Sequence, residues 1–164
     1  MSERPGELRF VLGDGSRRRL VGVHPDLVLV VERAISLTAC DFAVTEGLRM
    51  PERQRELVAA GASQTLDSRH LTGHAVDLAA YVGGRISWDW PLYYQIADAM
   101  RAAARATSIP IRWGGIWDRR LNDLPAGAEA LESEVAAYVA RRRSAGAKVF
   151  LDGPHFELPR EEYP

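Results

Sequence analysis

Cysteine is almost absent from this chain of 164 residues. The single Cys40 has no partner for an intramolecular disulfide, and a zinc site built from several thiolates is excluded. Cys40 lies in the segment 37–42, where no neighbouring side chain would activate a thiolate. We therefore expect Cys40 to be a buried and inert thiol.

An excess of charge of one sign is also missing, because 21 Lys and Arg residues face 22 Asp and Glu residues. Without a basic excess, no nucleic-acid partner is predicted. Lysine itself is nearly absent: Lys148 is the only one, and every other basic residue is an arginine. We interpret this bias as a feature of genome composition rather than of function.

Long hydrophobic runs are absent as well, and none approaches the ~20 residues that a membrane-spanning helix requires. The polar segment 1–7 has no apolar stretch of the kind found in signal peptides. We expect synthesis in the cytoplasm, with any later export needing another factor. With 46% hydrophobic residues the chain can form a core without disulfides, and we expect residues 1–164 to form a single domain.

Hydrophobic spacing and the positions of Gly and Pro predict the secondary structure. Helices are expected from Pro25, over 52–60, from Asp89 to about 109, and over 128–144. Short strands are expected over 42–45, 75–81, 111–113, 149–151 and 155–158, with turns at 13–15, 83–84 and 152–154. Since helices and strands do not alternate regularly, we predict an α+β fold with a small antiparallel sheet flanked by helices.

Two segments far apart in the sequence, 68–77 and 152–157, carry the residues of a candidate metal site. His70, Asp77 and His155 offer two imidazoles and one carboxylate, which suit a zinc ion with an open fourth position. In the expected strand 75–81, Asp77 would share a face with small alanines that leave room for an ion. The spacing alone is a weak signal, because the chain has no His-Glu-x-x-His motif.

Three neighbouring residues each admit two interpretations. His74 would lie on the opposite strand face from Asp77, which favours a core or supporting histidine over a ligand. Glu157 shares a strand face with His155 and is either its hydrogen-bond acceptor or a solvated surface residue. Asp152 is either a turn-forming aspartate or a general base beside a metal-bound water.

Taken together, the motifs resemble the zinc peptidases of bacterial cell-wall peptides. The matching motifs are Ser68-x-His70-x-x-Gly73-x-Ala75-x-Asp77, Trp113-Gly114-Gly115 and Asp152-x-Pro154-His155-Phe156-Glu157. This group includes D-alanyl-D-alanine carboxypeptidases and the L-alanyl-D-glutamate endopeptidases that serve as phage endolysins. Segments 22–27 and 45–49 resemble the endolysin branch in particular. The resemblance covers about residues 10–158 and implies a hedgehog/DD-peptidase-like fold.

The resemblance implies a role for each matching residue. His70, Asp77 and His155 would bind Zn²⁺, and Asp152 would act as general base and general acid. The residues implied to contact the substrate or to shape its site are Arg49, Gln54 and Ser68. We add Trp113, which is either a core residue or a wall of the cleft, since the adjacent glycines permit close backbone approach.

Three features depart from the family pattern. Ile116 stands where an acidic residue often follows the Trp-Gly-Gly motif, and Met50 replaces a small hydroxyl residue. Residues 118–151 make a longer helical excursion than in compact relatives. We expect this excursion to form one wall of the cleft.

The leading hypothesis for function is zinc-dependent hydrolysis of the peptidoglycan stem peptide at the L-Ala–D-Glu bond. A D-Ala-D-Ala carboxypeptidase or dipeptidase with the same residues is the closest alternative. A non-catalytic zinc-binding or cell-wall-binding module is the alternative from another class. We expect a monomer that reaches the cell wall during phage or prophage lysis.

Overall fold

The computed structural model describes residues 9–164, so the expectation for segment 1–7 lies outside the described residues. The strands are β1 (Phe42–Glu46), β2 (Ala75–Val82), β3 (Arg85–Ser87), β4 (Arg112–Gly114), β5 (Ile116–Arg120) and β6 (Asp152–Glu157). The α-helices are α1 (Asp14–Arg19), α2 (Pro25–Leu37), α3 (Pro51–Ala59), α4 (Trp90–Thr107) and α5 (Ala128–Ser144). Two short 3₁₀ helices complete the list, η1 (Arg69–Thr72) and η2 (Leu121–Asp123).

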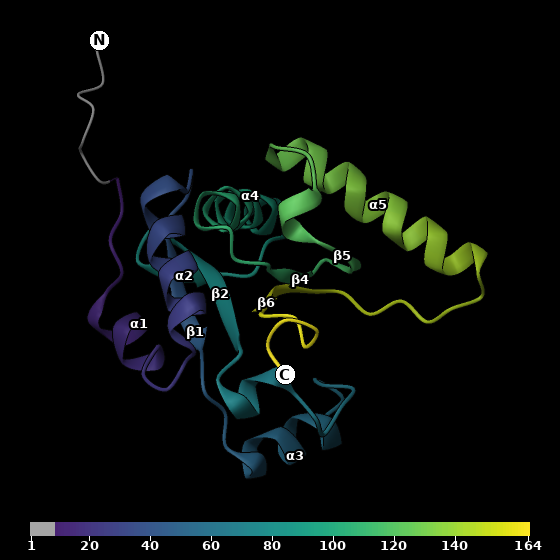
Figure 1. Ribbon diagram of the computed structural model, residues 1–164, viewed down its shortest axis with the longest axis horizontal. Helices are drawn as coiled ribbons and strands as arrows, with labels where there is room; N and C mark the ends of the chain where they lie inside the picture. The colour runs from purple at the N-terminus through teal and green to yellow at the C-terminus, as the bar shows by residue number, and fades with distance from the viewer. Residues whose placement is uncertain (1–8) are drawn as a thin grey trace.

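A mixed arrangement of helices around one antiparallel sheet confirms the predicted α+β fold. The strand order is β1-β2-β6-β4-β5, and β3 forms a hairpin with the end of β2. Helix α2 packs on α4, and α4 also contacts α5. In Figure 1 these three helices surround the upper part of the sheet, whereas α3 lies apart at the bottom. Strands β2 and β6, which carry the two candidate metal segments, are direct neighbours.

Helix α2 shows how local sequence sets an element boundary. The ring Nδ1 of His24 accepts a hydrogen bond from the backbone N–H of Asp26, and Pro25 occupies the first turn, where its missing N–H costs nothing. The face of α2 that packs inward consists of Leu27, Val30, Val31, Ala34 and Ile35. Leu37 remains 47% exposed, because it lies in the last turn, beyond the core.

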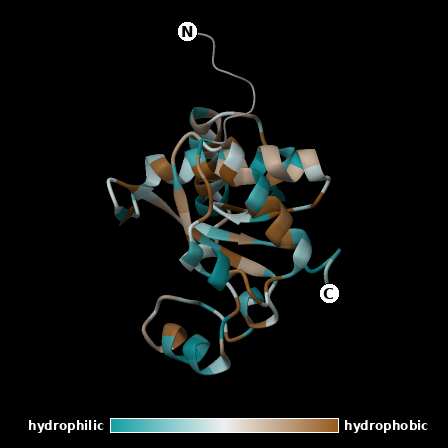
Figure 2. Ribbon diagram, turned by 90° about the vertical axis from the view of Figure 1, so that its left-hand side faces the viewer, coloured by the Kyte–Doolittle hydropathy of each residue, from teal (hydrophilic) through white to brown (hydrophobic). Residues whose placement is uncertain are grey.

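The core lies between the helices and the sheet. In Figure 2 the hydrophobic, brown segments run along the central strands and the helices next to them. The largest fully buried side chains include Trp113 of β4, Phe156 of β6, Leu78 of β2 and Met100 of α4. Helix α5 coincides with the predicted range 128–144 and turns Leu131, Val135 and Tyr138 inward.

The N-terminal prediction was wrong. A turn was expected at residues 13–15, but α1 begins at Asp14. The Ser16 hydroxyl accepts a hydrogen bond of 3.0 Å from the backbone N–H of Val44 in β1. This tertiary contact anchors a short helix that two glycines disfavour locally.

The C-terminal prediction was also wrong in one respect. Segments 149–151 and 155–158 were expected as two strands around a turn, whereas Asp152–Glu157 is one strand and residues 149–151 are irregular. Phe156 pairs with Trp113, and Asp152 with Gly114, so three residues of β6 bulge out opposite a single step of β4. A bulge tolerates Pro154, which cannot donate to the ladder.

Strand β5 is a further element that the sequence analysis missed. Its residues 116–120 overlap the start of the expected excursion 118–151, but they pair with β4 immediately after Gly115. Cys40 also differs slightly from expectation, because it is only partly buried. Burial still raises the pKa of the Cys40 thiol, which agrees with an inert side chain.

Candidate active site

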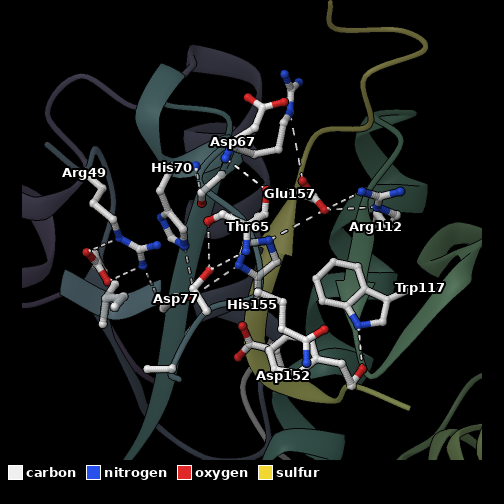
Figure 3. A pocket seen from close by; sticks show the side chains of 18 of the residues that line it. Arg49, Thr65, Asp67, His70, Asp77, Arg112, Trp117, Asp152, His155 and Glu157 are labelled. Atoms are coloured by element: carbon white, nitrogen blue, oxygen red, sulfur yellow. Dashed lines mark hydrogen bonds and ion pairs between the residues drawn. The ribbon is translucent and has the colours of Figure 1, made fainter. Parts of the chain in front are cut away.

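The three predicted metal ligands come together at the centre of the sheet. Asp77 and His155 lie directly opposite each other on β2 and β6, and His70 reaches them from η1. The Asp77 Oδ1 atom lies 3.2 Å from His70 Nε2 and 3.4 Å from His155 Nδ1. One ligand atom from each residue falls within 4.8 Å of the others, a spacing at which the group can hold a metal ion. Figure 3 shows the three side chains pointing toward one another.

Contacts with Gly47 and with its own loop fix the position of His70. Its Nδ1 lies 2.8 Å from the carbonyl oxygen of Gly47, which can only accept, so Nδ1 carries the proton and Nε2 is free to bind a cation. The Ser68 hydroxyl accepts a hydrogen bond from the His70 backbone N–H and caps η1. Gly73 ends η1 in the left-handed conformation, φ 74°, and lets the chain turn into β2.

His155 is fixed from its other side. Its Nε2 lies 3.7 Å from Glu157 Oε1, which leaves Nδ1 directed at Asp77. Glu157 is 2% exposed and accepts two hydrogen bonds from the guanidinium of Arg112, at 2.9 and 3.0 Å. Glu157 is therefore buried beside His155, where it can support that ring, and the interpretation as a solvated surface residue is wrong.

The electrostatics of this group favour a bound cation. Burial alone would keep the Asp77 carboxyl protonated, but the neighbouring His70 and His155 outweigh it and hold its pKa well below the usual range. Burial would likewise lower the pKa of His155, yet Asp77 and Glu157 raise it to about 10. The Asp77 carboxylate thus draws positive charge to the position between the imidazoles, and a divalent ion can supply that charge in place of a proton.

Asp152 lies at the start of β6 and lines the same cleft as the metal group. Residues three apart on a regular strand point to opposite faces, but the bulge in β6 lets both Asp152 and His155 face the cleft. Burial is the main cause that raises the pKa of Asp152, and the charge of Asp77 adds to it. The side chain is therefore not the simple turn aspartate that sequence reasoning allowed, because no turn is present.

Arg49 follows β1 and is 8% exposed. Its guanidinium donates two hydrogen bonds of 2.6 Å to the Glu46 carboxylate and one of 2.7 Å to Gln54 Oε1. It also lies 3.5 Å from Asp77 Oδ2. Arg49 lines the cleft beside the metal group, so its positive charge is available there.

The cleft over these residues has a volume of about 730 Å³. Residues between Glu46 and Arg160 line it, and the excursion 118–151 contributes Asp118, Tyr138, Arg142, Lys148 and Phe150.

Comparison with known proteins identifies the family of this chain. Residues 8–126 match the phage L-alanyl-D-glutamate peptidase family. The chain belongs to this family. The L-alanyl-D-glutamate peptidase of Escherichia phage T5 is 32% identical over 115 residues, which are 68% of this chain and 84% of that protein. The crystal structure of the Serratia marcescens L-Ala D-Glu endopeptidase ChiX has a TM-score of 0.72 and 41% identity, covering 97% of this chain and 98% of that one.

A further relative matches over a shorter stretch. The L-alanyl-D-glutamate peptidase of Listeria phage A118 is 35% identical over 77 residues, which are 47% of this chain and 26% of that protein. The chain therefore spans only about a quarter of that relative. The family match confirms the resemblance to the endolysin branch and identifies the chain as an enzyme of this class.

In this family member, Trp113 does not form the wall of the cleft. It is 0% exposed, its ring stacks on Phe156, and its Nε1–H donates to the carbonyl of Gly153 at 2.8 Å. The adjacent glycines serve this packing rather than the cleft. A Cβ on Gly114 would overlap the Asp152 carbonyl oxygen, and one on Gly115 would overlap the Trp113 ring.

Trp117 of β5 takes the place that was expected for Trp113. It lines the cleft, its ring lies 5.4 Å from the His155 ring, and the Arg112 guanidinium lies 5.5 Å above it. From the sequence, Trp117 could be either a core residue or a cleft wall, because strand β5 was not recognised. Ile116 is 1% exposed, and the alternation of a strand would have placed Trp117 on the opposite side.

Gln54 is also placed differently from the expectation of a substrate contact. It is 1% exposed, accepts from Arg49 and donates to Ser63, so its bonds are made within the protein. Gln54 therefore supports the Arg49 side chain through this buried hydrogen bond. His74 is half-buried and outside the metal group, with its Nδ1 2.7 Å from the Thr72 hydroxyl, as expected for a histidine that is not a ligand.

Proposed function

We propose that this enzyme hydrolyses the L-Ala–D-Glu bond of the peptidoglycan stem peptide with a zinc ion held by His70, Asp77 and His155. The observation that carries the proposal is the convergence of these three side chains in a cleft that Asp152 also lines. The family match and the names of the phage and Serratia relatives support the choice of bond.

The donor set fits zinc. Two imidazole nitrogens and one carboxylate oxygen are the ligands of catalytic zinc sites that keep a fourth position open. Both imidazoles are supported through their other ring nitrogen, His70 by Gly47 and His155 by Glu157, as is usual for zinc-binding histidines. A zinc ion in this position would act as a Lewis acid toward the scissile carbonyl and would make water acidic enough to attack near neutral pH.

Asp152 is the proposed general base and general acid. Its carboxylate takes a proton from the attacking water as the new C–O bond forms at the L-Ala carbonyl. The same carboxyl then gives that proton to the D-Glu nitrogen as the C–N bond breaks, so that an acid and a free amine leave. A pKa raised by burial brings the carboxyl closer to the pH at which proton transfer in both directions is efficient.

Arg49 and Ser68 are the proposed substrate contacts next to the metal group, since both line the cleft. An arginine binds a carboxylate through two parallel hydrogen bonds, and the stem peptide carries free carboxylates. Arg49 already makes such a pair with Glu46, so a substrate carboxylate would share or exchange this partner. Gln54 would hold the Arg49 side chain in place.

Product analysis of purified peptidoglycan tests the proposed bond. We expect mass spectrometry to show released stem peptides that begin with D-Glu, with L-Ala left on the sugar. Release of a single D-Ala, without new D-Glu amino termini, would instead identify the carboxypeptidase alternative. Binding without any release from a zinc-loaded sample would identify the non-catalytic alternative.

The site of action follows from the proposed substrate. The enzyme would reach the cell wall at the end of a phage or prophage cycle, and we propose that it acts as a monomer. In the part of the chain that the structure describes, no helix is long and apolar enough to cross a membrane. Light scattering on the purified protein would check the monomer.

A further inference from the structure

The cleft wall formed by the excursion 118–151 carries two cations without a carboxylate partner. Within residues 9–164, Lys148 takes part in no ion pair, and Arg142 bonds only to a backbone carbonyl. The other arginines lining the cleft differ, because each has a carboxylate partner: Arg49 pairs with Glu46, Arg69 and Arg112 with Glu157, and Arg160 with Asp67. These two side chains therefore leave positive charge unbalanced at one place in the cleft.

The two cations are held next to each other. Arg142, in the last turn of α5, donates from Nε and Nη2 to the carbonyl oxygen of Lys148, at 3.1 and 2.8 Å. This contact fixes the loop that follows α5 against the helix, and both side chains line the cleft. The nearest acidic residue of the same wall, Asp118, is already paired with Arg141 at 3.3 Å.

An aromatic surface connects this pair with the metal group. The His155 ring lies 5.4 Å from the Trp117 ring, and the Trp117 ring stacks on Phe150 at 6.5 Å. The Trp117 Nε1–H donates to the Phe150 carbonyl, and Phe150 follows Lys148 by two residues. Extended peptide advances ~3.3–3.6 Å per residue, so the path from the His155 ring to the Phe150 ring spans at most about 3–4 residues. Lys148 and Arg142 line the same cleft, and we assign them to the second or third residue on one side of the scissile bond rather than to the reacting atoms.

The chemistry of the substrate decides which side that is. The carboxyl of L-Ala is part of the scissile bond, and the lactyl carboxyl of the sugar is bound to the L-Ala amine. Free carboxylates therefore occur only on the D-Glu side of the bond. The unbalanced pair of cations therefore suits the D-Glu side of the scissile bond. The second residue on that side is the third residue of the stem, which follows D-Glu.

We propose that Lys148 and Arg142 form a carboxylate-binding subsite for the third stem residue. The enzyme then prefers stems whose third residue carries a free side-chain carboxylate, as diaminopimelate does, over stems with lysine, which presents only an ammonium. This inference rests on the proposed cleavage of the L-Ala–D-Glu bond. It assigns a direction to the bound peptide, from the metal group along Trp117 and Phe150 toward α5.

The test compares two soluble disaccharide-tetrapeptides that differ only in the third residue, diaminopimelate or lysine. With the zinc-loaded wild-type enzyme we expect kcat/KM to be roughly 3- to 10-fold higher for the diaminopimelate substrate, the size of one partly solvated charge-assisted contact. The difference should lie mainly in KM, because the contact is distant from the reacting atoms and is the same in the ground and transition states.

Variants assign the preference to the subsite. Lys148→Gln should remove most of the preference by raising KM for the diaminopimelate substrate, whereas Lys148→Arg should keep it. Arg143→Gln is the matched control, since it removes one positive charge at an exposed residue of the neighbouring helix α5 that does not line the cleft. Zinc content should be equal in all three variants, which separates a binding effect from damage to the metal group.

The single lysine permits a second, chemical readout. Acetylation of side-chain amines can neutralise only Lys148, and reductive methylation would modify the same amine while keeping its charge. We expect acetylation, but not methylation, to reduce cleavage of the diaminopimelate substrate. The diaminopimelate product should also slow acetylation of Lys148, as measured by mass spectrometry.

The outcomes distinguish the subsite from the activity itself. Equal kcat/KM for the two substrates, or an unchanged preference in Lys148→Gln, would overturn the subsite while leaving the proposed cleavage intact. No D-Glu amino terminus from either substrate, with zinc bound and the fold intact, would overturn the proposed cleavage.

Discussion

Asp77 determines how the candidate metal group is charged. One of its oxygens lies between the two histidine rings, and the other lies 3.5 Å from the Arg49 guanidinium. Burial would raise the pKa of this carboxyl, but the two histidines beside it outweigh burial and hold the pKa well below its usual range, so the carboxylate is ionised. Replacing any of the three ligand residues would leave the others without the complete donor set that zinc requires.

The ligand assignment predicts the zinc content of single variants. The wild-type protein should contain about one zinc per chain, and His155→Ala should lose most of it, because two ligands bind far more weakly than three. His74→Ala is the matched control and should keep its zinc, since His74 lies outside the group. Metal analysis after dialysis measures both, and full occupancy in His155→Ala would refute the assignment.

The role of Asp152 predicts a variant that separates metal binding from turnover. Asp152→Asn keeps the size and polarity of the side chain but cannot accept a proton from water. We expect kcat to fall by ~10²–10⁴-fold with unchanged zinc content and unchanged circular dichroism, the usual contribution of a general acid–base group. Activity close to the wild type would show that another carboxylate does this work, and Glu46 and Glu157 would be the next candidates.

Among the elements, the bulged pairing of β4 with β6 has the greatest effect on the site. It places Asp152 and His155 on the same side, although they lie three positions apart along the strand. The pairing depends on Gly114, because any side chain there would overlap the Asp152 backbone. The Trp-Gly-Gly motif is thus explained by packing within the sheet rather than by contact with substrate.

This packing predicts the effect of one added methyl group. Gly114→Ala should lower the free energy of unfolding by roughly 2–4 kcal/mol, since the backbone of β6 must shift. Activity should fall as well, because the shift moves Asp152. Gly13→Ala is the control with no neighbour within 4 Å of the added Cβ, and it should change stability little. Urea unfolding of both variants checks the difference, and equal stability would show that β6 can adjust freely.

The elements also show what the sequence alone can predict. Helix α5 and strand β2 lie close to their expected ranges, since hydrophobic spacing and terminal Gly and Pro residues are local signals. Strand β5 and the single strand β6 depend on pairing with β4, a contact that no local pattern reports. The choice between core and cleft wall stayed open for Trp113 and Trp117 for this reason, because only the pairing of β4 with β5 decides which of them faces the cleft.

For the site, spacing alone gave a weak signal, and the combined motifs carried the assignment. The support of His155 by Glu157 follows from the period of two along a strand and could be expected from sequence. The position of Gln54 beside Arg49 could not be expected from sequence, because it depends on hydrogen bonds to a loop after α3.

In the whole molecule, the metal group and the hydrophobic core occupy different places. The core lies between the sheet and helices α2, α4 and α5, whereas the metal group joins β2, β6 and η1 at the cleft. Because the core does not contain the ligands, the fold should survive loss of the ion at room temperature. An ion held by these three residues would bind only the folded chain, so it should add to the stability.

Removal of the metal with a chelator tests this separation. An ion present at ~1,000 times its Kd adds ~4 kcal/mol, so we expect Tm to fall on the order of 10 °C, while the circular dichroism spectrum at 25 °C stays the same. Peptidoglycan cleavage should disappear and return with added zinc. Magnesium should restore neither Tm nor cleavage, because it prefers six oxygen ligands over a site with two imidazoles. Full activity in a sample shown to be free of metal would refute a metal-dependent reaction, whereas loss of the folded spectrum would show that the core depends on the ion.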